Sequence, residues 1–246
     1  TIALILLYYL GGYWQTKDLY NGLIQTELII IALPVFIVLK LLKLKPKEIL
    51  RFKTPKPAGL ILVPFIAISA SIIVSIMSQL INTIFPYPEK YTEALTQLFN
   101  MNEAPWKVFL AIALLPGICE ELLFRGFLIR FFEKYGLQWA VIISAILFAA
   151  FHLDPFRFVP VLLLGFLLGY LALRSGSVYT SMLSHIINNG LAFILVTYSN
   201  SSWVKFLVSE GDNIHYWLFI PALVVFVISL YAFHKVTAQG EEVCVE

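Results

Sequence analysis

Residues 58–85 read AGLILVPFIAISASIIVSIMSQLINTIF and contain no Asp, Glu, Lys, Arg or His. The hydrocarbon core of a bilayer is about 30 Å thick, so about 20 consecutive apolar residues are enough for one helix to cross it. The run is continuously apolar and does not alternate with a period of two, which favours a helix over a strand of a membrane barrel. This stretch therefore predicts a transmembrane helix.

The composition extends this prediction to the rest of the chain. Of its 246 residues, 60% are hydrophobic and 13% are charged, whereas a soluble domain has about 45–50% and about 25%. A disordered chain or a nucleic-acid-binding protein is excluded, since each needs a polar or strongly basic composition. We predict an all-α, polytopic transmembrane bundle of about eight helices, with residues 1–246 forming a single membrane-embedded domain. The predicted spans are 1–14, 23–44, 58–85, 106–131, 137–153, 157–173, 178–198 and 214–234.

The distribution of basic residues predicts the orientation in the membrane. The connector between the second and third spans contains one acid, Glu48, and many basic residues, so by the positive-inside rule it is cytoplasmic. With eight spans, both termini then lie in the cytoplasm. The run 1–14 is too short to cross alone and resembles a helix whose start is missing more than a signal peptide. The basic residues of the connector are Lys40, Lys43, Lys45, Lys47, Arg51, Lys53 and Lys56.

Two further patterns concern packing. Gly165 and Gly169 form a GxxxG pattern in the sixth span, which favours close approach of another helix. Residues 89–102 place apolar side chains, including Tyr91, at helical spacing with acids opposite. This segment predicts an amphipathic helix that lies along the membrane interface or packs on the bundle.

Ionisable residues inside the predicted spans are the second main signal, because each costs about 2.5–3.5 kcal/mol near the bilayer centre and usually faces a cavity. Those that we identify fall in PGICEELLFRG (116–126), LFAAFHLDP (147–155) and TSMLSHIINNG (180–190). In the first segment, Glu121 and Arg125 are four residues apart with the acid first, the favourable order for an ion pair. Glu120 points about 100° away from that pair and is left free, as a catalytic carboxylate requires.

The backbone just before Glu120 and the residues of the third segment are also typical of a polar site inside the bundle. Pro116 and Gly117 loosen the helix just before Glu120, which at membrane depth is tolerated where protein or a cavity surrounds the backbone. His185 and Asn189 are four residues apart and therefore share one helix face. An imidazole and a carboxamide on one face can donate hydrogen bonds to an oxyanion. We expect a pocket near Glu120.

Taken together, the three segments contain EExxxR (Glu120, Glu121, Arg125), FxxxH (Phe148, His152) and HxxxN (His185, Asn189), in this order on apolar helices. This set resembles the CAAX protease and bacteriocin-processing (Abi) family of glutamic intramembrane endopeptidases, related to the Ras-converting enzyme. The resemblance covers about residues 105–192.

The resemblance implies a function for each motif. Glu120 and His152 would activate a water for attack on a peptide carbonyl, and His185 and Asn189 would stabilise the oxyanion. We interpret Glu121 and Arg125 as structural or substrate-orienting. The implied partner is a membrane-anchored protein or peptide substrate in a lipid bilayer, with no nucleic acid, no metal and no other cofactor.

Three alternatives remain open. The first is a zinc-dependent membrane protease in which His152, His185 and a glutamate hold the metal, although the chain has no HExxH motif. In the second, Cys119 is a nucleophile paired with a histidine; a buried apolar thiol is usually inert, which disfavours this alternative. The third is a non-catalytic immunity, scaffold or transport protein of the same fold. The intact motif positions favour a protease over this last alternative.

Overall fold

The computed structural model describes residues 7–97, 103–208 and 213–237. Almost all of these residues are helical and none of them lies in a β-strand, which confirms the all-α prediction. The α-helices are α2 (Gly12–Lys17), α3 (Leu19–Gln25), α4 (Leu33–Leu41), α5 (Pro46–Ile49), α6 (Pro57–Ile84), α7 (Glu89–Gln97), α8 (Pro105–Phe109), α9 (Leu115–Glu121), α10 (Ile129–Phe132), α11 (Leu137–Phe151), α12 (Phe158–Ser175), α13 (Val178–Thr197), α14 (Ser202–Leu207) and α15 (Phe219–Val236). The π-helical turns are η1 (Leu7–Gly11), η2 (Thr26–Ala32), η3 (Leu110–Leu114) and η4 (Leu122–Leu128), and the 3-10 turns are η5 (Glu133–Tyr135) and η6 (Tyr216–Leu218).

Five helices of the described chain are long and apolar enough to cross a membrane, which supports an integral membrane protein. They coincide with five of the eight predicted spans. A sixth predicted span, 137–153, forms the shorter apolar helix α11. The five long helices are Leu19–Leu41, Pro57–Ile84, Phe158–Ser175, Val178–Thr197 and Tyr216–Val236.

The remaining two predicted spans, 1–14 and 106–131, differ from simple apolar helices. Residues 1–6 lie outside the described part of the chain, and the helix that follows ends at Lys17 before Asp18 starts α3. The span 106–131 is a continuous helix from Pro105 to Phe132 that is widened by η3 and η4. It does not qualify as a purely apolar span because it contains the EExxxR motif.

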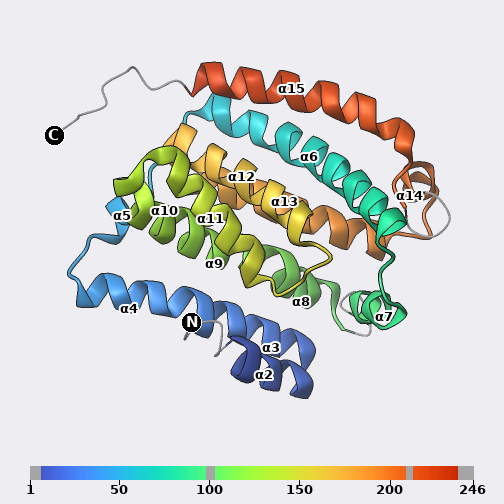
Figure 1. The fold of residues 1–246 in the computed structure, drawn as a ribbon, viewed down its shortest axis with the longest axis horizontal. Helices are drawn as coiled ribbons and strands as arrows, with labels where there is room; N and C mark the ends of the chain where they lie inside the picture. The colour runs from blue at the N-terminus through green and yellow to red at the C-terminus, as the bar shows by residue number, and fades with distance from the viewer. Residues whose placement is uncertain (1–6, 98–102, 209–212, 238–246) are drawn as a thin grey trace.

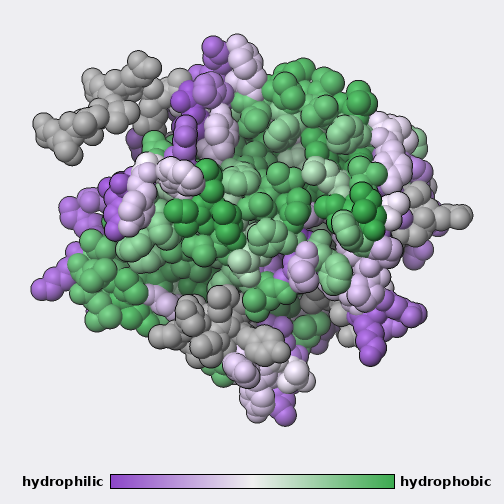
Figure 2. All heavy atoms as spheres, in the orientation of Figure 1, coloured by the Kyte–Doolittle hydropathy of each residue, from purple (hydrophilic) through white to green (hydrophobic). Residues whose placement is uncertain are grey.

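The bundle is arranged in successive rows of helices. Figure 1 shows α15 beside α6 on one side, α3 and α4 on the opposite side, and α9, α11, α12 and α13 between them. Figure 2 shows broad apolar areas over the viewed face, with hydrophilic groups toward the ends of the molecule. Large apolar side chains of α15, such as Ile220 and Ile228, are exposed, as is expected of a helix that faces lipid.

Glycines set the closest helix contacts. A Cβ built on Gly117 of α9 would lie 2.4 Å from Ile186 Cγ1 and 3.0 Å from the Ile186 backbone nitrogen on α13. A Cβ on Gly165 would lie 3.0 Å from the Cα of Ala145, so α12 packs directly on α11. The packing interpretation of the GxxxG pattern is therefore confirmed at Gly165. The Gly117 contact brings together the helices that carry the first and third motifs, and the Gly165 contact packs α12 on the helix that carries the second.

Helix α7 packs against the loop between α11 and α12. The Tyr91 hydroxyl donates to Asp154 Oδ2 at 2.7 Å, and the Tyr91 ring lies 4.8 Å from the Phe156 ring, centroid to centroid. Burial disfavours the charged form of Asp154, but hydrogen bonds from Tyr91 and Arg157 outweigh burial and hold the pKa of Asp154 below its usual value. At Tyr91 the amphipathic segment thus packs on the bundle; Leu98 and Phe99 of the same predicted helix lie outside the described residues.

We predict that Gly117→Ala destabilises the bundle by about 1–3 kcal/mol, because the new methyl group meets the α13 backbone as well as a side chain that can move. Gly12→Ala is the matched control, since a Cβ at Gly12 meets nothing within 4 Å. Thermal unfolding of both variants in detergent micelles measures the difference. Equal melting temperatures for Gly117→Ala and the wild type would contradict the close approach of α9 and α13.

Candidate active site

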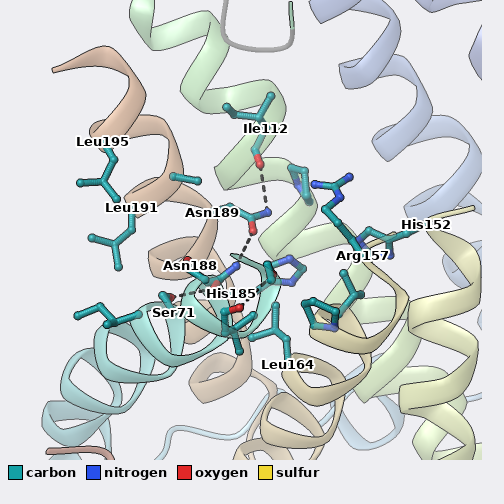
Figure 3. Close-up of a pocket in the computed structure, with 18 of the residues that line it drawn as sticks. Ser71, Ile112, His152, Arg157, Leu164, His185, Asn188, Asn189, Leu191 and Leu195 are labelled. Carbon is teal, nitrogen blue, oxygen red and sulfur yellow. Dashed lines mark hydrogen bonds between the residues drawn. The ribbon is translucent and has the colours of Figure 1, made fainter. Parts of the chain in front are cut away.

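A cavity of about 520 Å³ lies between α3, α6, α9, α11, α12 and α13. Most of the surface that lines the cavity is apolar, and a minority of the lining residues are polar. Figure 3 shows His185, Asn188 and Asn189 of α13 together with Ser71 of α6, His152 and Arg157 around this cavity. Glu120 also lines it, so all four residues that the family resemblance makes catalytic, Glu120, His152, His185 and Asn189, reach a common space.

Glu120 lines the cavity with a buried side chain. Its Oε2 atom is enclosed and has no hydrogen-bond partner among the described residues. Nε2 of His185 lies 3.8 Å from that oxygen, which is too long for a hydrogen bond. The described residues therefore do not hold Oε2 of Glu120 by a hydrogen bond.

Glu121 does not line the cavity, and its carboxylate contacts both Arg125 and His185. Its Oε1 accepts from Arg125 Nη1 at 2.6 Å and lies 2.9 Å from His185 Nδ1. Glu121 and Arg125 are both fully buried. The ion pair predicted from the sequence is therefore present, and His185 is a third member that sequence spacing did not indicate.

Arg125 connects this cluster to two more helices. Its Nη2 donates to the carbonyl of Gly165 on α12 at 3.1 Å, and its guanidinium lies 4.2 Å from the centre of the Phe148 ring on α11. The cation is thus held by a carboxylate, a backbone carbonyl and an aromatic face. It cannot reach the cavity, so its place in the site is to hold Glu121 and, through it, His185.

His152 ends α11 and has a defined tautomer. Its Nδ1 lies 2.8 Å from the carbonyl oxygen of Phe148, and a carbonyl can only accept, so Nδ1 carries the hydrogen. In the neutral ring, Nε2 then has a free lone pair. The Phe148 ring contacts both His152 and His185, with ring centroids 4.8 Å and 5.7 Å apart. Phe148 of the FxxxH motif therefore orients both imidazoles.

Asn189 is fixed by a chain of hydrogen bonds that crosses three helices. Its Nδ2 donates to the carbonyl of Ile112 at 3.1 Å, and this carbonyl is the one that Pro116 cannot satisfy four residues later. Asn188 donates to Asn189 Oδ1 at 3.1 Å, and Ser71 donates to Asn188 Oδ1 at 2.8 Å. Figure 3 draws this chain from Ser71 to Ile112. The amide of Asn189 has two hydrogens, so one remains for a ligand.

Sequence reasoning missed Glu27, which lies on η2 and lines the same cavity. Its side chain is buried and Oε2 has no hydrogen-bond partner. The signal was available, because Glu27 is an acid inside the predicted span 23–44. Asn188, which the HxxxN motif does not include, also lines the cavity and orients its neighbour Asn189.

The structure bears on two of the alternative chemistries. Cys119 is buried in an apolar cluster with Ile31, Phe124 and other residues and does not line the cavity, so its thiol serves packing. In the part of the chain that the structure describes, no three His, Cys, Asp or Glu side chains converge as metal ligands. Nδ1 of His185 is also taken by Glu121.

We predict that Glu121→Gln lowers the free energy of unfolding by about 3–5 kcal/mol, since it leaves Arg125 charged and unpaired in the interior. The control is Glu48→Gln, which removes one carboxylate from an exposed pair with Lys45 and should change stability by no more than about 1 kcal/mol. Chemical unfolding of the purified proteins measures both values. A Glu121→Gln protein as stable as the wild type would show that the buried pair does not stabilise the bundle.

Comparison with known proteins identifies the region that forms the site. No curated protein and no solved structure matches the chain. A family model does match it, and the matched family is a protease family, which supports a peptide hydrolase acting on a membrane-associated substrate in lipid. Residues 102–191, which carry all three motifs, match the model described as type II CAAX prenyl endopeptidase Rce1-like, and this match confirms the family resemblance found in the sequence.

Proposed function

We propose that this protein is a glutamic intramembrane endopeptidase that hydrolyses a peptide bond of a membrane-associated protein or peptide. The observation that carries the proposal is the common cavity of Glu120, His152, His185 and Asn189 within a bundle of apolar helices. Acid, base and hydrogen-bond donors that face one another are the minimum set for hydrolysis of an amide. The family match over residues 102–191 supports the same reaction class.

Glu120 and His152 are the candidates for activation of water. The carboxylate of Glu120 can take a proton from a water in the cavity, and Nε2 of His152 can accept a hydrogen bond from the same water. The water oxygen then attacks the carbonyl carbon of the substrate. Because the cavity is mostly apolar, the charges that develop in this step are poorly screened and respond strongly to the protein groups around them.

His185 and Asn189 are the candidates for stabilisation of the oxyanion. The second hydrogen of the Asn189 amide is free to donate, while the first holds the amide against Ile112. His185 donates from Nε2 when both ring nitrogens carry hydrogen, and the bond from Nδ1 to the Glu121 carboxylate stabilises that cation. Donors fixed before the reaction lower the barrier most, because they need no rearrangement in the transition state.

The orientation of the helices in the membrane decides from which side the site can be reached. We infer a single membrane-embedded domain with cytoplasmic termini, in which the basic connector before α6 faces the cytoplasm. The cavity extends to Arg157, which precedes α12, and to Leu207 of α14, and Figure 1 shows α14 at the end of the bundle away from α5. A substrate segment therefore has to enter the space between the helices to reach Glu120.

We predict that Glu120→Gln and His152→Ala each reduce turnover by at least about 10²-fold, because each removes a proton acceptor while the fold is kept. The first reporter is a prenylated peptide with a C-terminal CAAX sequence. Mass spectrometry of new peptide ends in membranes that contain wild type or Glu120→Gln supplies further reporters. Cleavage by Glu120→Gln at the wild-type rate would refute the proposed mechanism.

The Asn189 variants give a graded test of the oxyanion assignment. We predict that Asn189→Ala lowers kcat by about 10²–10³-fold with little change in KM, because the donor acts on a charge that exists only around the transition state. Asn189→Asp should be worse, since its carboxylate repels both the oxyanion and the Ile112 carbonyl. Wild-type activity of Asn189→Asp would show that this side chain does not face the oxyanion.

A further inference from the structure

Glu27 is a second carboxyl group that lines the cavity. It lies on the π-helical turn η2, which packs against α9, the helix that carries Glu120. Only 6% of Glu27 and 8% of Glu120 is exposed, and each has an Oε2 atom without a hydrogen-bond partner. Two unsatisfied buried carboxyl groups that share one cavity need an explanation beyond packing.

The charges around Glu27 show why the two groups act together. Arg125, the buried cation of this region, is bonded to Glu121 and does not line the cavity, whereas Glu27 and Glu120 both line it. Two carboxylates that repel each other in a poorly solvated space are stable when they share one proton between them. A carboxylate and a carboxylic acid in one cavity are the pairing that water activation and leaving-group protonation require.

We propose that Glu27 is a further catalytic residue, which holds the proton that the leaving amine receives. This inference rests on the proposed protease function. The Glu120 carboxylate takes a proton from water as the water oxygen bonds to the carbonyl carbon. Glu27 then gives its proton to the amine nitrogen as the C–N bond breaks. Glu120 passes the proton from water to Glu27, so both groups return to their starting states and the net reaction is hydrolysis of one peptide bond.

Glu27→Gln and Glu27→Asp test this role on the intact chain with the prenylated CAAX reporter. Gln keeps the shape but has no transferable proton, so we expect kcat to fall by about 10²-fold, with KM and the melting temperature unchanged. Asp keeps the proton on a shorter side chain and should retain more activity than Gln. Glu48→Gln, an exposed change of the same type, should behave as wild type.

An infrared measurement gives a readout that does not depend on turnover. The wild type should show the carbonyl stretch of a protonated carboxylic acid in the interior, and Glu27→Gln should lose it. Absence of this band, equal activity of the Gln and Asp variants, or wild-type activity of Glu27→Gln would each overturn the role of Glu27 alone. Failure of the protease proposal itself would give a different result, because the wild type would then cleave the reporter no faster than Glu120→Gln.

Discussion

The buried guanidinium of Arg125 fixes the centre of the bundle. Its charge is balanced by Glu121 on the same helix, by the Gly165 carbonyl on α12 and by the ring of Phe148 on α11. Glu121 in turn holds His185 on α13. A buried charge is tolerated only when its partners are in place. The position of an imidazole in the cavity therefore depends on contacts made by groups that never touch the cavity.

The sequence predicted the features that are local along one helix. The pairing of Glu121 with Arg125, and the shared face of His185 and Asn189, follow from a spacing of four residues. Close packing at Gly165 was also predictable, because small residues at helical spacing permit it. The family motifs added the order of the polar segments, and the structure brings Glu120, His152, His185 and Asn189 to one cavity.

Contacts between distant segments were not predictable, because helical periodicity says nothing about which helix faces which. The bond between Glu121 and His185 joins residues 64 positions apart, and the bond between Ser71 and Asn188 joins residues 117 positions apart. Glu27 was missed for another reason. It is the single acid of the predicted span 23–44, and the residues three and four positions away from it are all apolar, so no polar cluster at helical spacing marks it.

The π-helical turn Leu110–Leu114 separates the length of a helix from the direction in which Glu120 points. A π turn accommodates one residue more than an α-helical turn, and this one precedes Glu120 on the same continuous helix. Deletion of one residue there would let the turn close into an α-helix while the residues on either side keep nearly the same rotational register. The same deletion in an α-helical turn would rotate everything after it by about 100°. The turn Leu110–Leu114 can therefore lose one residue without turning Glu120 away from His185, which an α-helical turn in its place could not do.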